Sequence, residues 1–107
     1  MAKEYLGEFE ELILTLVAGL QEEAYGAMIA MKIEKDFKRE ITLSAVHTTL
    51  YRLEDKGYVR SKIGGATNER GGRRKRIFSV THAGFTILKA MKESRLQLWN
   101  MVPQLKM

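Results

Sequence analysis

The architecture of this chain follows from two neighbouring stretches, SAVHTTLYRLEDKG at residues 44–57 and GGATNERGGRRKR at residues 64–76. In the first stretch, Val46, Leu50 and Leu53 recur at the spacing of one helix face, so these side chains should point into a core. The second stretch is a glycine-rich loop crowded with cations. We therefore expect a helix with an outward polar face, followed by a basic hairpin.

Polar side chains cover the outward face of this predicted helix. On a helical wheel that turns by about 100° per residue, the outward residues are Ser44, Thr48, Tyr51, Arg52 and Asp55, with His47 and Thr49 on the flanks. The major groove of B-DNA admits one α-helix, whose outward polar side chains reach the edges of the bases. Because any surface helix presents polar residues to water, the helix alone leaves both a DNA-reading face and a solvated face open.

The excess positive charge lies next to this helix. The chain carries a net charge of +5, yet residues 58–76 alone hold seven basic residues and one acidic residue, Glu69, and so carry +6. Charge concentrated in this way indicates a polyanionic partner, whereas a solvated charge run would interleave more acids. The cations expected to follow the phosphate backbone or to enter the minor groove are Arg70, Arg73, Arg74 and Lys75.

Periodicity predicts further elements on both sides of this helix. They are a helix from Phe9 to Leu20, a helix that opens near Tyr25-Gly26 and reaches Phe37, strands from Tyr58 to Gly64 and from Arg74 to Val80, and a long helix from His82 to about Val102. Thr42 or Ser44 can cap the central helix, Gly57 can end it, and Thr81 can cap the last helix. The expected order is helix, helix, helix, hairpin, helix, and the fold class is α+β, mainly α.

Length, composition and cysteine content narrow the class of protein. With 107 residues, of which 45% are hydrophobic, the chain is expected to form one globular domain. It shows neither an apolar run of about 18 residues, as a membrane span requires, nor a signal peptide. The absence of cysteine excludes disulfides and thiolate metal sites and fits the cytosol. We expect a cytoplasmic protein without a membrane partner.

The sequence offers little for catalysis or metal binding. His47 and His82 are the only histidines and stand 35 residues apart, so we expect neither a metal nor another cofactor. There is no cysteine nucleophile, no Gly-x-Ser-x-Gly elbow and no phosphate loop, because no helix opens directly after the glycine pairs of residues 64–72. We therefore expect that the protein is not an enzyme. The hairpin also lacks the aromatic platform on which single-stranded RNA would stack.

The last predicted helix has more apolar surface than one copy of the chain can cover. One stripe consists of Phe85, Leu88, Leu96 and Trp99, and another of Ile87, Met91, Leu98 and Met101. Because a large exposed apolar patch is unusual on a monomer, a second copy of the chain is the simplest partner. Trp99 fits either packing in such a dimer or the wall of a small-molecule pocket between subunits, on which a planar ligand stacks.

Three motifs mark a resemblance that covers nearly the whole chain, from about Leu6 to Trp99. They are Tyr25-Gly26 followed by Ile29, then Leu50-x-Arg52-Leu53-Glu54-x-x-Gly57, then Arg70-Gly71-Gly72-Arg73-Arg74-Lys75-Arg76-x-Phe78-x-Val80-Thr81-x-x-Gly84. Each motif alone would be weak, but together they are specific. With them the chain resembles the short PadR-type transcriptional regulators, which have a single C-terminal helix.

The resemblance implies a winged helix-turn-helix over residues 1–81, with three helices and a two-stranded hairpin as the wing, and a C-terminal dimerisation helix over residues 82–107 of the same continuous domain. It implies sequence-specific binding of a palindromic operator by a homodimer, most often as a repressor, with release by a small apolar or aromatic effector in some members. The implied DNA contacts are Ser44, His47, Thr48, Tyr51, Arg52, Arg70, Arg73, Arg74 and Lys75. The implied dimer contacts are Leu12, Leu16, Leu88, Met91, Leu98 and Trp99, and Trp99 is also the candidate for an effector pocket.

One residue departs from the family pattern. His47 stands where the family usually has a tyrosine, so a phosphate contact expected of the tyrosine hydroxyl would need an imidazole N–H here. A winged helix can also serve as a protein–protein interaction module without specific DNA binding. The charge concentrated in residues 58–76 favours DNA, and the interaction module stays as the alternative.

Overall fold

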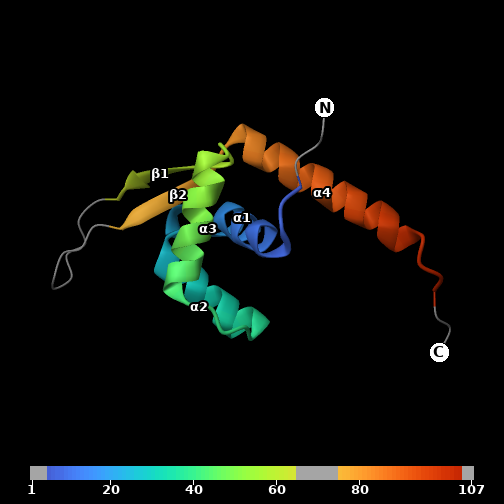
Figure 1. Cartoon of the computed structure of the whole chain (residues 1–107), viewed down its shortest axis with the longest axis horizontal. Coiled ribbons are helices and arrows are strands. Elements are labelled where there is room, and N and C mark those ends of the chain that lie inside the picture. The colour runs from blue at the N-terminus through green and yellow to red at the C-terminus, as the bar shows by residue number, and fades with distance from the viewer. Residues whose placement is uncertain (1–4, 65–74, 105–107) are drawn as a thin grey trace.

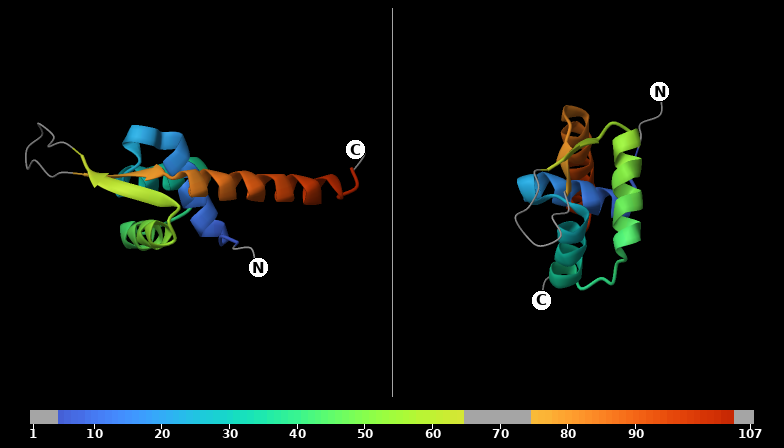
Figure 2. Two further views of the ribbon diagram at one scale, coloured as in Figure 1. Left: turned by 90° about the horizontal axis from the view of Figure 1, so that it is seen from above. Right: turned by 90° about the vertical axis from the view of Figure 1, so that its left-hand side faces the viewer.

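The computed structural model describes residues 5–64 and 75–104 of the chain. Within them the elements are α1 (Glu8–Leu20), the short 3-10 helix η1 (Gln21–Glu23), α2 (Gly26–Phe37), α3 (Leu43–Asp55), β1 (Val59–Ile63), β2 (Arg76–Val80) and α4 (His82–Asn100). This order confirms the predicted fold class, α+β and mainly α. The hairpin and α4 extend in opposite directions from the first three helices (Figure 1), and α3 and η1 lie on opposite sides of the hairpin (Figure 2).

Threonine side chains start α3 and α4, as the sequence predicts. The Thr42 hydroxyl accepts a hydrogen bond from the backbone N–H of Ala45 at 3.0 Å, so Thr42, the first of the two predicted candidates, caps α3. The Thr81 hydroxyl accepts from the N–H of Gly84 at 3.1 Å and donates to the carbonyl of Gly57 at 2.6 Å. Thr81 therefore starts α4 and also ties it to the turn that follows α3.

The strands and α4 are shorter than predicted. The prediction starts β1 at Tyr58, but the N–H of Tyr58 bonds the carbonyl of Leu53 at 2.9 Å and so closes the end of α3 instead of joining the strand ladder. β2 begins at Arg76, and its predicted start at Arg74 lies outside the described residues. The prediction ends α4 at about Val102, but the N–H of Val102 bonds the carbonyl of Trp99 at 3.0 Å, three residues back. This is the tighter hydrogen-bond pattern of a 3-10 turn, and α4 ends at Asn100.

The hairpin register decides which side chains face α3. β1 and β2 pair antiparallel, with Val59 opposite Val80, Ser61 opposite Phe78 and Ile63 opposite Arg76. Val59 and Phe78 are 2% and 1% exposed, so their face of the hairpin is the one that packs on the helices. Because successive side chains of a strand point to opposite faces, Arg76 shares the face of Phe78.

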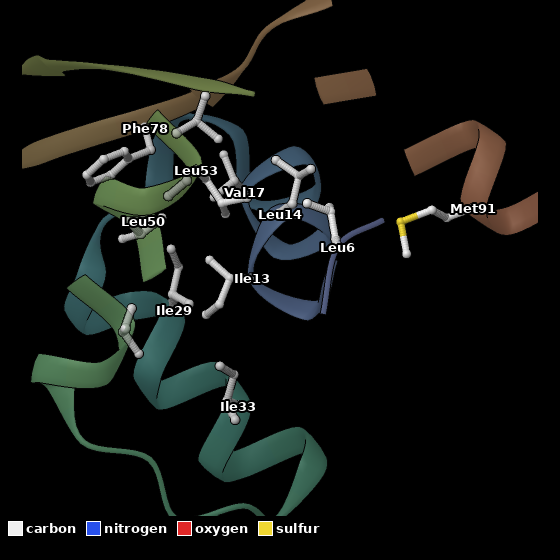
Figure 3. Packing of buried hydrophobic residues seen from close by; sticks show 13 residues of the cluster. Leu6, Ile13, Leu14, Val17, Ile29, Ile33, Leu50, Leu53, Phe78 and Met91 are labelled. Carbon is white, nitrogen blue, oxygen red and sulfur yellow. The ribbon is translucent and has the colours of Figure 1, made fainter. Parts of the chain in front are cut away.

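A buried apolar cluster joins the helices to the hairpin (Figure 3). Its members are Leu6, Ile13, Leu14, Val17, Ala24, Ile29, Ile33, Val46, Leu50, Leu53, Val59, Phe78 and Met91. The predicted inward face of α3 is confirmed, because Val46, Leu50 and Leu53 are fully buried. Met91 reaches the cluster from α4 and points toward Leu6 (Figure 3).

The acidic first turn of α1 connects three other parts of the fold. Each of its carboxylates pairs with a cation from a different segment: Glu8 with Arg39 after α2 at 2.7 Å, Glu10 with Lys56 after α3 at 3.0 Å, and Glu11 with Arg95 of α4 at 2.9 Å. Carboxylates also suit the positive end of a helix dipole. The end of α3 and the middle of α4 are thereby both held against α1.

The start of α4 lies directly against the turn that precedes β1. A Cβ atom on Gly84 would lie 2.2 Å from the carbonyl oxygen of Tyr58, closer than two such atoms can approach, so a glycine is required here. The N–H of Thr81 bonds the same carbonyl at 3.0 Å. These contacts explain the Thr81-x-x-Gly84 pattern and fix the place where α4 leaves the hairpin.

Candidate nucleic-acid interface

The outward side of α3 carries the polar residues that the helical wheel predicts there. Ser44, Thr48, Tyr51 and Arg52 are all exposed. Thr49 does not lie on a flank as expected, because it is only 5% exposed. The buried face of α3 is wider than the wheel suggests, since α1, α2 and β1 all pack against this helix.

His47 lies at the junction of α3 and α2. A Cβ atom on Gly26 would lie 2.2 Å from the Nε2 atom of His47, so the half-buried imidazole rests on the first residue of α2 and accounts for the glycine of the Tyr25-Gly26 motif. The ring centroids of His47 and Tyr51 are 6.2 Å apart, and the Tyr51 ring meets Phe78 edge-on at 6.1 Å. A series of three rings thus links the start of α2, the outward side of α3 and the hairpin.

Arg52 lies close to the acidic end of α1. Burial raises the pKa of Glu10, but the hydrogen bonds from the Gly7 N–H and Lys56, with the charges of Lys56 and Arg52, together hold that pKa below its ordinary value. The exposed guanidinium of Arg52 is therefore in the field of a carboxylate that stays ionised at neutral pH. Arg52 remains at the surface, where it is able to meet a ligand.

The loop end of the described hairpin holds a cation on the side of η1 and α2. The Nζ atom of Lys75 lies 4.2 Å from the centroid of the Tyr25 ring, a cation–π contact that gives the Tyr25-Gly26 motif a second structural role. The other predicted wing cations, Arg70, Arg73 and Arg74, lie outside the described residues. Lys75 is thus the predicted wing residue whose surroundings the structure describes.

A hydrogen-bonded series on the opposite face of the hairpin was not predicted from the sequence. The Nη1 atom of Arg76 donates to the Ser61 hydroxyl at 2.9 Å, and that hydroxyl donates to the Oε2 atom of Glu54 at 2.7 Å. Glu54 belongs to the last turn of α3. The only signal in the sequence is the alternation of the strands, and it identifies these neighbours only once the register across the long loop is known.

The exposed side of α4 and the first helix form an apolar groove. Phe85, Leu96, Leu98 and Trp99 are 60%, 53%, 63% and 68% exposed. A groove of about 890 Å³ runs between α1 and α4, and its apolar lining includes Leu12, Leu88, Leu96 and Trp99. Of the predicted dimer contacts, Met91 differs from the rest, because it is 8% exposed and packs within the chain's own core.

Residues 5–64 and 75–104 contain neither a candidate metal cluster nor a single helix that could span a membrane. No three histidine, aspartate or glutamate side chains in this part of the chain are close enough together to hold a metal ion. No single described helix has the length and apolar character needed to cross a bilayer. Only Glu8–Glu23 and Gly26–Phe37 taken together reach that length and composition, and the two are bent by 119° from each other.

The sequence matches a known family over most of its length. The model of the Transcriptional regulator PadR-like family matches residues 13–93. No curated protein sequence matches the chain significantly. The family match spans α2, α3 and the hairpin, the elements that build the candidate interface.

Several solved structures share this fold. A PadR-like transcription factor from Bacteroides fragilis has a TM-score of 0.71 at 19% identity, over 87% of this chain and 84% of that chain. A PadR-like transcriptional regulator from Bacillus cereus has a TM-score of 0.70 at 19% identity, over 87% of this chain and 85% of that one. The subunit in the complex structure of hsRosR-S1 has a TM-score of 0.67 at 25% identity, over 86% of this chain and 74% of that one.

Proposed function

The chain belongs to the PadR-like family of transcriptional regulators, and on this basis we propose that it binds double-stranded DNA with sequence specificity, as a homodimer that represses transcription from a palindromic operator. The observation that supports this best is the exposed polar face of α3, with Thr48 and Arg52, beside a hairpin that carries Lys75 and Arg76 at the loop end of its described strands. A helix fits the major groove while a neighbouring cationic hairpin reaches the phosphate backbone or the minor groove. In this proposal residues 1–81 bind DNA and residues 82–107 form the dimerisation helix.

The residues of α3 take different parts in this proposal. Thr48 and Arg52 supply hydroxyl and guanidinium groups to the edges of bases, and Ser44 and Tyr51 contact the DNA beside them. His47, whose ring rests on the start of α2, offers an imidazole N–H to a backbone phosphate in place of the tyrosine hydroxyl of the family. Arg70, Arg73, Arg74 and Lys75 neutralise phosphates next to the groove.

The Thr48→Ala variant is expected to lose discrimination between operator and random DNA. If the hydroxyl reads a base, the free energy of binding to the operator becomes less favourable by about 1–3 kcal/mol, while the affinity for random duplexes stays the same. The measurement is fluorescence anisotropy with both kinds of DNA at one salt concentration. Arg52→Ala is expected to act in the same direction.

A threonine of α4, the helix proposed for dimerisation, offers a matched control for Thr48→Ala. Thr86 is an exposed threonine of α4 whose hydroxyl donates to the carbonyl of His82 at 2.9 Å. Thr86→Ala should leave both affinities as they are. Equal losses on operator and random DNA in Thr48→Ala would refute a base-reading role for α3.

The dimer in this proposal forms through the exposed apolar side of α4, helped by α1. Leu98 and Trp99 are mostly exposed in the single chain, and Leu12 and Leu88 line the groove beside them. Leu16 is half-buried on the same helix as Leu12. Burying these side chains against a second copy removes apolar surface from water and joins two recognition helices for a palindrome.

A small apolar or aromatic effector is proposed to bind beside Trp99, where it would change the tilt of the two recognition helices. Trp99 lines the groove between α1 and α4, so a planar ligand that enters this groove would stack on its indole. An effector needs a differential affinity of only a few kcal/mol between two arrangements to shift their populations.

We expect the Trp99 fluorescence of the dimer to be quenched by a member of a panel of planar cations and phenolic acids. Emission unaltered by the whole panel would contradict this effector class.

A further inference from the structure

Two hydrogen bonds in series connect Arg76, a cation of the hairpin, to α3. Arg76 donates to the Ser61 hydroxyl at 2.9 Å, and the same hydroxyl donates to the Glu54 carboxylate at 2.7 Å. A serine hydroxyl has a single hydrogen, so its donation to Glu54 leaves its lone pairs to accept from Arg76. The direction of the whole series is therefore fixed, from Arg76 through Ser61 to the last turn of α3.

The place of Arg76 in the hairpin brings it to the side on which α3 lies. Arg76 pairs with Ile63 at the far end of the described ladder and shares the face of Phe78. Phe78 in turn meets the ring of Tyr51, a residue of the exposed side of α3, at 6.1 Å. Arg76 is exposed, whereas Ser61 and Glu54 are half-buried, so the guanidinium is the outer end of the series.

The bridge leaves the arginine able to bind an anion. Among the described residues, the Ser61 hydroxyl accepts a hydrogen bond from Arg76, and a guanidinium has further N–H donors in a planar fork that matches a phosphate group. A carboxylate that bonded the guanidinium directly would compete with such a phosphate. Here the Glu54 charge acts through the Ser61 hydroxyl instead, which orients the guanidinium and accepts only one of its five N–H donors.

We infer that Arg76 is a further contact to the DNA backbone and that Ser61 and Glu54 are its positioning residues. This inference rests on the proposed function and extends it to the first residue of β2. Holding a long side chain in one rotamer before binding removes an ordering cost of about 0.5–1.5 kcal/mol from the binding step. Converted to affinity, this is about twofold to tenfold for each subunit.

A double-mutant cycle with a mixed-sequence DNA duplex tests the inference, because phosphate contacts are independent of sequence. The proteins are the full chain and its variants Ser61→Ala, Arg76→Ala and the two combined, each titrated over a salt series. Arg76→Ala should flatten the slope of log K against log salt by about 0.9 for each subunit. Ser61→Ala should weaken binding by about twofold to tenfold for each subunit when Arg76 is present, and by nothing further when Arg76 is already alanine.

Two more variants separate positioning from a general effect on the fold. Ser61→Thr keeps the hydroxyl and should restore the affinity of the original chain. Ser79→Ala makes the same chemical change on the opposite face of the hairpin, where Ser79 pairs with Arg60, and should change nothing.

The outcomes distinguish this inference from the function on which it rests. An unchanged slope in Arg76→Ala, or a loss in Ser61→Ala that persists without Arg76, overturns the inference while DNA binding itself stands. If the original chain fails to bind the duplex at low salt, the proposed function is wrong and the inference falls with it. Loss only when Arg76 is present, with rescue by Ser61→Thr, supports it.

Discussion

Replacing Arg73 and Arg74 together with alanine is expected to weaken binding to every DNA sequence alike. In a homodimer this change removes four cations, each of which would neutralise a backbone phosphate. The slope of log K against log salt should then flatten by about three to four units, at about 0.9 for each lost contact, and affinity at moderate salt should fall on the order of a hundredfold or more. Titration of the operator and of a random duplex over the same salt series measures both quantities.

A control with the same change in net charge shows whether the location of the charge matters. Lys32 and Lys35 lie in α2, on a segment that extends away from the hairpin (Figure 1). Replacing these two lysines with alanine should alter the slope much less than the change at Arg73 and Arg74. If affinity and its salt dependence are unaltered by the change at Arg73 and Arg74, or if the α2 control loses as much, the cations of the hairpin do not bind the DNA backbone.

Replacing Leu98 with glutamate is expected to convert the dimer into a folded monomer. Leu98 is 63% exposed in the single chain, so a carboxylate at this position stays in water and leaves the fold intact. In a dimer through α4 the same carboxylate would be buried in an apolar contact and would face its own copy across the twofold axis. The measurements are the molar mass in solution, by light scattering, and the unfolding temperature.

Dissociation of the dimer should also weaken binding to the operator strongly. Two linked recognition helices bind a palindrome about 10²–10⁴-fold more tightly than one, so the monomer should retain only the affinity for a half-site. Gln97→Glu, an exposed polar position beside Leu98, adds the same charge and should stay dimeric. A dimeric Leu98→Glu protein, or dissociation of both variants alike, contradicts a dimer formed by the apolar stripe of α4.

Local patterns were enough to predict most of the fold. The spacing of Val46, Leu50 and Leu53 identifies the inner face of α3. Capping depends only on residues within one turn, so the sequence predicts Thr81 as the cap of α4 and narrows the cap of α3 to Thr42 or Ser44. The alternation that predicted the hairpin is also a local signal. These features need no knowledge of which distant segments meet.

The contacts between distant segments could not be predicted in the same way. Ser61 and Arg76 are neighbours only because of the strand register, and the loop between β1 and β2 is too long for its sequence to set that register. The packing of His47 on Gly26 depends on how α3 crosses α2. Met91 has the same apolar character as its neighbours on α4, and only the packing of α4 on the rest of the fold distinguishes its buried face from the exposed one.

In the proposed complex, two copies of α3 and its adjacent hairpin read a symmetrical DNA site. The decisive test is selection of genomic fragments by the purified protein, followed by sequencing of the bound pool. The bound fragments should share an inverted repeat, with half-sites about one helical turn or a multiple of it apart. If the protein retains no fragments, or retains fragments with no sequence in common, it does not read such a site, and an interaction module that binds other proteins is favoured.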